Sequence, residues 1–296
     1  MTASVHASPS PPAAGVHILC PRWGAEQSGW ERFLDRVAEA GYDGVEWGVG
    51  AGVSSAEVEE VLARAARRRL LIVAQHHDTE AADFARHRAA YAAWLDRIAP
   101  LRPHRINSQT GLDHFSFDQN RALLDLAGET AARHGVAIAH ETHRRKFSYA
   151  AHVTRAYLER IPSLRLTLDV SHWVCVAESF LEDQPEALAL AIARTDHLHA
   201  RVGHPEGPQI PDPRAPEWRD AVERHLAWWD AVAAQRRAAG AELLCTVEFG
   251  PFPYLPRLPF TEQPVADQWE LNLHMLRLLR GRYGPPNAPG IGPQRS

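Results

Sequence analysis

Acidic and histidine side chains recur at the ends of apolar, strand-like segments of this 296-residue chain. The densest stretch is "HLHARVGH", residues 197–204. Alternate residues of a strand point the same way, so His197, His199 and Arg201 would share one face. Burying three such side chains together is unfavourable unless something on that face needs nitrogen donors or ligands.

Three further segments each present a carboxylate at the same point of a strand. Alternation turns Glu141 inward in "AHETHRR", Asp169 in "LTLDVSHW" and Glu248 in "CTVEFG". Three carboxylates and one imidazole carry too much negative charge to stay unpaired, and one divalent cation would neutralise it. Such a ligand set suits Mn²⁺, Co²⁺, Mg²⁺ or Zn²⁺, and we expect no organic cofactor. Singly, a buried carboxylate more often pairs with arginine or caps a helix, and a buried histidine more often packs in a core.

These side chains can converge only if the fold brings successive strand ends to one rim. Short apolar runs alternate with longer amphipathic stretches, and the pattern predicts eight strand–helix units. The expected strands span residues 16–20, 44–48, 70–76, 104–108, 136–142, 164–170, 197–202 and 243–249. This count favours an α/β fold of the (β/α)₈ TIM barrel type, whose active sites lie at the C-terminal rim. No glycine-rich phosphate loop follows the first strand, which disfavours a doubly wound sheet.

The composition disfavours two classes of partner and indicates the domain boundaries. The formal net charge of −4 argues against nucleic acid, and no apolar run is long enough to span a membrane. Cys20, Cys175 and Cys245 are too few for a disulfide framework, which favours buried free thiols in a cytoplasmic protein. Residues 1–14 and 284–296 are rich in small residues and proline, so we expect disordered tails around one catalytic domain, 15–283. Association into a homo-oligomer stays open.

Several motifs in order resemble the xylose isomerase-like barrels, which include sugar and ketose 3-epimerases, inosose dehydratase, hydroxypyruvate isomerase and apurinic endonucleases. The motifs are "GYDGVEWG", the "ET" of the fifth strand, "LDVSHW", "HLH" and "VEFG", within residues 16–280. The resemblance implies that one divalent metal is held by Glu141, Asp169, His199 and Glu248. It also implies that His199, rather than His197, is the ligand and that His172 contacts a substrate oxygen.

The chemistry implied is a metal-dependent isomerase or epimerase acting on a small carbohydrate or polyol-derived substrate. The metal would polarise a carbonyl and stabilise an enediolate, while a glutamate removes the neighbouring proton. The epimerase-like members imply that Glu141 and Glu248 form the catalytic pair. The same groups could serve a metal-dependent lyase or dehydratase on a keto-sugar, keto-inositol or glycoside. A non-catalytic carbohydrate-binding barrel is less favoured. So is an apurinic endonuclease, because the fourth strand offers "NSQTG" where that class needs a histidine.

Further side chains near the strand ends are candidates to bind substrate. They are His172, Arg201, His143, Arg144, His76, His77, Trp23, Trp47 and Gln109. Only one of the adjacent His76 and His77 is expected to face the pocket. We expect Arg145 and Lys146 on the solvated surface. The proline-rich loop 203–218 is expected to form a rigid wall or lid over the site.

Overall fold

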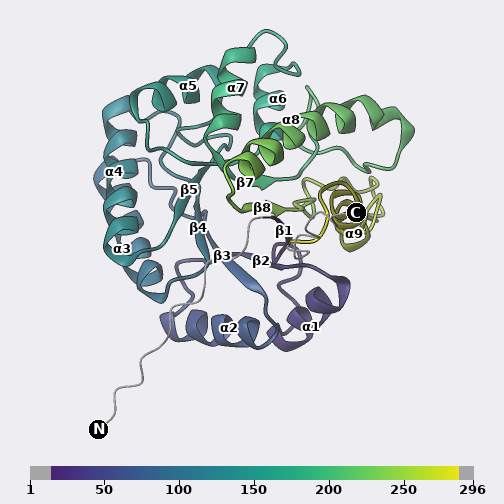
Figure 1. Ribbon diagram of the computed structural model, residues 1–296, viewed down its shortest axis with the longest axis horizontal. Helices are drawn as coiled ribbons and strands as arrows, with labels where there is room; N and C mark the ends of the chain where they lie inside the picture. The colour runs from purple at the N-terminus through teal and green to yellow at the C-terminus, as the bar shows by residue number, and fades with distance from the viewer. Residues whose placement is uncertain (1–14, 287–296) are drawn as a thin grey trace, which may run out of the picture.

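The computed structural model describes residues 15–286, which form a closed barrel of eight parallel strands in chain order (Figure 1). The strands are β1 Val16–Pro21, β2 Gly44–Gly48, β3 Leu71–His76, β4 Arg105–Ser108, β5 Ile138–Glu141, β6 Leu166–Leu168, β7 Thr195–His199 and β8 Leu243–Thr246. Because β8 pairs with both β7 and β1, the sheet has no free edge. The predicted (β/α)₈ barrel is confirmed.

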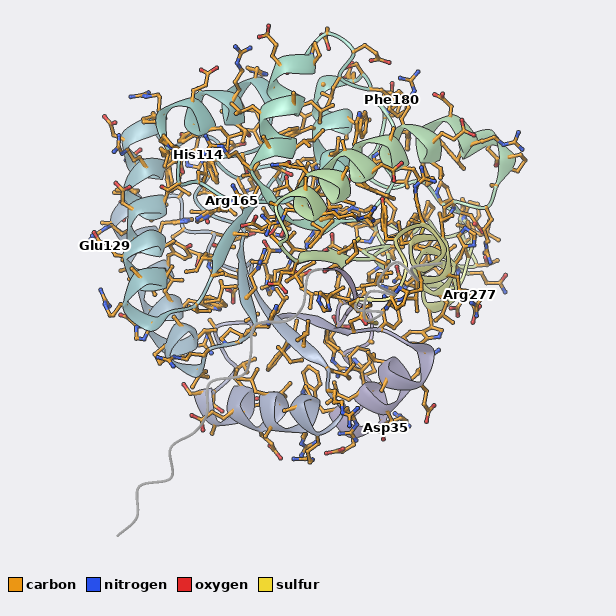
Figure 2. The ribbon with its side chains drawn as sticks, in the orientation of Figure 1. Asp35, His114, Glu129, Arg165, Phe180 and Arg277 are labelled. Carbon is orange, nitrogen blue, oxygen red and sulfur yellow. The ribbon has the colours of Figure 1, made fainter. Side chains whose placement is uncertain are left out.

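A ring of helices surrounds the barrel (Figure 1). The α-helices are α1 Trp30–Ala40, α2 Ser55–Arg67, α3 Phe84–Ile98, α4 Phe117–His134, α5 Ala151–Arg160, α6 Val170–Ala177, α7 Pro185–Ala193, α8 Arg219–Ala238 and α9 Gln268–Tyr283. Two short 3₁₀ turns, Ala99–Leu101 and Pro216–Trp218, precede β4 and α8. Figure 2 shows Asp35, Glu129 and Arg277 at the periphery of this ring, where charged side chains remain hydrated.

Local sequence signals set where the helices begin and end. Ser116 and Gln119 form a capping box at the start of α4, and Gly135 ends that helix with φ 64°. These are the start and stop signals visible in the sequence. At α6 the cap is Asp169, whose Oδ1 accepts a hydrogen bond of 2.9 Å from the Ser171 amide. One of the predicted metal ligands is therefore fixed by the helix that it starts.

The inside of the barrel has an apolar floor and a polar upper layer. Leu19, Val73 and Leu244 form a small cluster separate from the main core, which lies between strands and helices. Two residues further along their strands, in the same phase, come Gln75 and Thr246. Polar side chains thus gather toward the C-terminal rim of the barrel, where active sites of this fold are built.

The observed strands are shorter than predicted where they approach the rim. β5 ends at Glu141, β6 at Leu168 and β8 at Thr246, because the chain leaves the hydrogen-bonded ladder to form the rim. β7 begins at Thr195 and ends at His199, so Arg201 follows the strand rather than belonging to it. The β6–β7 connection holds two helices, α6 and α7.

Three further expectations concern the tails, membrane-spanning helices and the cysteines. The predicted tail 1–14 lies outside the described residues, as does 287–296 of the predicted tail 284–296. Within the described part, no helix is long and apolar enough to cross a membrane. The three cysteines are free; Cys20 and Cys245 are buried, as expected, whereas Cys175 is only half-buried.

The buried His225 joins α8 to the loop that follows β7. Its Nδ1 donates to the Ala221 carbonyl at 2.8 Å, and its Nε2 accepts from the Gly203 amide at 3.3 Å. A proton on Nε2 would face that amide hydrogen. Burial lowers the pKa of His225 from 6.5 to about 4, so the neutral ring is the folded form.

We expect His225→Gln to reduce the acid sensitivity of the fold. Unfolded chains take up a proton at His225 below pH 6.5, whereas the folded protein does so only near pH 4, so this contribution to stability falls as pH drops between these values. The difference in unfolding free energy between wild type and variant should shrink by about 2 kcal/mol from pH 7 to 5. Urea unfolding at both values measures it, and a difference that does not change with pH would contradict the assignment.

Candidate metal centre and active site

The four predicted ligands lie together at the C-terminal rim. Glu141 and His199 are the last residues of β5 and β7, Asp169 follows β6 directly, and Glu248 lies two residues beyond β8. Glu141, Asp169 and His199 are between 0% and 1% exposed, and Glu248 is 7% exposed. Four consecutive strands therefore direct ionisable side chains to one buried region.

His199 lies at the centre of this group. Its Nδ1 is 2.8 Å from Oε2 of Glu248 and 3.7 Å from Oε1 of Glu141. Ligand atoms of Glu141, Asp169 and His199 all lie within 4.8 Å of one another. One ion with bonds of about 2.1 Å would hold such atoms up to about 4.2 Å apart, so only small side-chain movements are needed.

Amide side chains hold the Glu141 carboxylate in place. Its Oε2 accepts hydrogen bonds from Gln75 Nε2 at 3.1 Å and Asn107 Nδ2 at 2.9 Å. Its Oε1 accepts from Gln109 Nε2 at 3.1 Å. Gln109 was a sequence candidate, whereas Gln75 and Asn107 were not. The three amides come from β3, β4 and the residue after β4, so the neighbouring strands orient this carboxylate.

Arg201 pairs with the carboxylates on the other side of the group. Its Nη2 forms an ion pair with Asp169 Oδ2 and lies 3.5 Å from Glu248 Oε2. The same nitrogen donates to His172 Nε2 at 2.8 Å. Arg201 thus faces the site, as its sequence phase predicts, and links His172 to the Asp169 carboxylate.

Sequence reasoning missed a fourth inward carboxylate, Glu46 on β2. It is 4% exposed, and its Oε2 is 2.9 Å from His199 Nε2. The signal was available, because Glu46 alternates with the apolar Val45 and Trp47 and must face the barrel interior. His197 lies one layer below His199, with Nε2 2.8 Å from Thr246 Oγ1 and 3.5 Å from Glu46 Oε2.

The pKa values show an excess of negative charge at this site. Burial opposes the charged form of His199, but the carboxylates of Glu248, Glu46 and Glu141 raise the pKa of His199 well above 6.5. Burial, opposed by Arg201 and reinforced by Glu248, raises the pKa of Asp169. Burial alone would raise the pKa of Glu46 as well, yet the charges of His199 and His197 lower it to about 2. Even a protonated His199 together with Arg201 cannot balance the four carboxylates.

A cavity of about 860 Å³ opens above these residues. Glu141, Glu248, Arg201, His143, Gln75 and Gln109 line its polar part. Its aromatic lining consists of Trp23, Trp30, Trp47 and Tyr254, of which Trp30 and Tyr254 were not predicted. The volume falls in the upper range for pockets that bind small organic molecules, about 300–1,000 Å³.

The indole of Trp23 is held rigidly on its side of the cavity. The Tyr254 ring packs edge-on against it at 5.2 Å between centroids. A Cβ atom at Gly250 would lie 2.2 Å from the indole, so glycine is required there for this close approach.

Other predicted residues divide between the cavity and the core. His77 lines the cavity, but His76 lies behind the barrel, with Nε2 2.7 Å from Thr79 Oγ1 and its ring against Tyr91 and Trp94. Arg144 is not among the cavity-lining residues; it donates to the Tyr254 hydroxyl at 3.1 Å.

Two expectations about the rim loops were wrong. Lys146, expected on the surface, is 3% exposed because the loop after β5 folds back over it, whereas Arg145 is solvated. The loop 203–218 does not line the cavity. Its Gln209 exchanges hydrogen bonds with the backbone of Gly250, which ties the loop to the chain beyond β8.

The donor atoms themselves fit a divalent cation. Nδ1 of His199 and Oε2 of Glu248 are buried, lie 2.8 Å apart and lack hydrogen-bond geometry to any described partner. An imidazole nitrogen, which would give up its proton to the ion, and a carboxylate oxygen that both face an inner point are what a coordinated ion requires. The excess of carboxylates over cationic side chains also favours a bound divalent cation.

Known structures resemble this chain in fold. Endonuclease IV from Thermus thermophilus shares 15% identity and a TM-score of 0.56, covering 90% of this chain and 99% of that one. The probable 3-DHS dehydratase AsbF from Bacillus anthracis, involved in petrobactin synthesis, shares 14% identity, a TM-score of 0.56 and the same coverage, 90% and 99%. An AP endonuclease, family 2, from Brucella melitensis shares 13% identity and a TM-score of 0.52, covering 81% and 94%. At such identities the likeness shows the fold alone.

No curated protein matches the chain. A family model described as "Xylose isomerase-like TIM barrel" matches residues 34–248, and this agrees with the resemblance seen in the short motifs. The chain belongs to the xylose isomerase-like TIM barrel family.

Proposed function

We propose that this protein is a divalent-metal-dependent isomerase or epimerase acting on a carbohydrate or polyol derivative. The observation that carries the proposal is the convergence of Glu141, Asp169, His199 and Glu248 below an 860 Å³ cavity. Two of these residues, Glu141 and Glu248, also line the cavity, where a substrate carbon would be accessible to them. We place the enzyme in the cytoplasm, in keeping with its free cysteines.

The two glutamates supply the proton transfers. Glu141 and Glu248 approach from β5 and from beyond β8, so each can reach a different side of a substrate lying between them. One carboxylate removes the proton next to the carbonyl and the other returns a proton, to the same carbon or its neighbour. A bound divalent ion would polarise the carbonyl and stabilise the negative charge that develops on its oxygen.

Residues around the glutamates would bind and orient the substrate. Arg201 and His143 present nitrogen groups to the polar part of the cavity, and Gln109 and His77 lie beside them. Trp23, Trp47 and the additional Trp30 offer ring faces on which the apolar side of a sugar can pack.

A lyase or dehydratase is the second candidate. His143 lines the cavity and its ring lies 4.0 Å from that of His172, which provides an imidazole besides the two glutamates. Burial lowers the pKa of His143 to about 4, so this imidazole is neutral and could act as an additional base when a hydroxyl or alkoxyl group β to the carbonyl departs. Product mass separates the two reactions, because elimination changes it and epimerisation does not.

An apurinic endonuclease fits these residues less well. The His76 side chain hydrogen-bonds Thr79 and does not reach the site. At the site, β4 presents the amide of Asn107 rather than a histidine. The net charge of −4 also disfavours a phosphate backbone as ligand.

The proposed function predicts metal binding. Chelator-stripped protein titrated with Mn²⁺, Co²⁺, Zn²⁺ or Mg²⁺ in a calorimeter should bind one ion per chain. Glu248→Ala should weaken binding by more than the roughly 10–100-fold that an outer-shell partner contributes, because a direct ligand is lost. Glu129→Gln, which removes an exposed carboxylate of α4, is the matched control and should bind as wild type does. Unaltered binding by Glu248→Ala would rule Glu248 out as a ligand.

The proposed function also predicts proton transfer at the carbon next to a carbonyl. A panel of ketopentoses, ketohexoses and keto-inositols incubated with the metal-loaded enzyme in D₂O should reveal a substrate that gains deuterium next to its carbonyl. Glu141→Gln and Glu248→Gln should slow this exchange by about 10²–10⁴-fold, since each loses an acid–base group. Mass spectrometry follows the exchange, again with Glu129→Gln as the control. If either glutamine variant exchanged at the wild-type rate, that glutamate would not be the base.

A further inference from the structure

The two ring nitrogens of His199 face different carboxylates. Nδ1 faces the cavity side, 2.8 Å from Glu248 Oε2, whereas Nε2 faces the barrel interior, 2.9 Å from Glu46 Oε2. Both sides are fully enclosed, because His199 is 0% and Glu46 4% exposed. Which nitrogen carries the proton therefore decides on which side this imidazole can bind a cation.

Glu46 is held in place by two other donors. Asn107 Nδ2 donates to its Oε1 at 2.7 Å, and the Thr246 hydroxyl donates to its Oε2 at 2.5 Å. An ionised carboxylate only accepts hydrogen bonds, so the third partner, His199 Nε2, must donate. Asn107 Nδ2 also donates to Glu141 Oε2 at 2.9 Å, which links Glu46 to the opposite side of the predicted metal site.

We propose that Glu46 is a positioning residue for the metal centre. It holds a proton on His199 Nε2, so that Nδ1 is the nitrogen that gives up its proton to an incoming ion on the side where Glu141, Asp169 and Glu248 converge. The inference rests on the proposed function, since it concerns the metal of that site. A carboxylate behind a ligand histidine fixes the ring orientation and makes the coordinating nitrogen a stronger donor.

The geometry disfavours the opposite arrangement, an ion on the interior side. Glu46, His197 and His199 do offer three donor atoms within 4.8 Å. However, the Thr246 hydroxyl gives its hydrogen to Glu46, so it must accept from His197 Nε2 at 2.8 Å. Both imidazole nitrogens on this side then carry hydrogens and have no lone pair for a cation. These residues form a hydrogen-bonded support.

The test compares Glu46→Gln with Glu129→Gln. Glutamine keeps the size of Glu46 but carries no charge. Its amide can also donate a hydrogen bond to His199 Nε2, so that this nitrogen no longer has to carry a proton. Calorimetric titration of chelator-stripped proteins with Zn²⁺ should show a Kd about 10–100-fold weaker for Glu46→Gln. Glu129→Gln, which makes the same change on the exposed face of α4, should bind as wild type does. Thermal melts followed by circular dichroism show whether each variant is folded.

A second readout reports the nitrogen itself. In the zinc-loaded protein labelled with ¹⁵N-histidine, two-bond nitrogen–proton correlation spectra should show His199 coordinated through Nδ1 and protonated at Nε2. In Glu46→Gln the Nε2 proton should exchange faster with solvent, whereas the Nδ1 proton of the buried His225 should exchange as in wild type, because a general packing defect would speed both. If Glu46→Gln does not fold, Glu46→Asp keeps the charge but withdraws it from Nε2, and should weaken zinc binding in the same direction.

The outcomes distinguish a failure of the positioning role of Glu46 from a failure of the proposed metal centre. Zinc on Nε2 of His199, an unchanged Kd for Glu46→Gln, or an equal loss for Glu129→Gln would each overturn the positioning role while the metal centre stands. A wild-type protein that binds no divalent ion would overturn the metal centre itself, and the positioning role with it.

Discussion

Buried negative charge around one imidazole is the constraint on which the rim of this barrel depends. His199 has Glu46 on one side and Glu141 and Glu248 on the other, and Asp169 completes the group through Arg201. Buried carboxylates are tolerated only when cations and donors are held close to them. The amides of Gln75, Asn107 and Gln109 and the guanidinium of Arg201 satisfy part of this demand. A divalent ion would satisfy the remainder.

The fold meets this constraint by adding one group per strand. Because neighbouring strands run parallel and close into a barrel, their C-terminal ends meet at one rim, and loops need not reach across the molecule. Asp169 also caps α6, so the strand-to-helix turn fixes its direction. Below the rim, Leu19, Val73 and Leu244 fill the barrel and keep water out from beneath the polar layer. Rigid elements thus hold each charged group in place.

Much of this arrangement could be predicted from the sequence, because two simple periodicities determine it. Strand–helix alternation predicted the barrel, and the phase within strands predicted which acidic and histidine side chains meet at the rim. Phase could also have identified Glu46 and Gln75, and it would have chosen His77 over His76, had it been applied to every strand rather than to the last four. Glu46 was overlooked because "GVEWG" is a short apolar strand whose one charged residue carried no motif of its own.

The features that were not predicted depend on tertiary packing. Lys146 is buried because the loop after β5 closes on the body of the protein, and its sequence neighbours do not reveal this. Likewise, the prolines of loop 203–218 indicate restricted backbone, but the direction of the loop is set by Gln209 bonding to Gly250. Both cases concern where a loop lies, which local sequence patterns do not determine.

The most direct measurement is a crystal structure of the protein soaked in Mn²⁺, with anomalous scattering recorded at the manganese edge. We expect one strong anomalous peak on the cavity side of His199, bonded to its Nδ1 and to oxygens of Glu141, Asp169 and Glu248. No peak at this site, or a peak on the interior side between Glu46 and His197, would contradict this expectation.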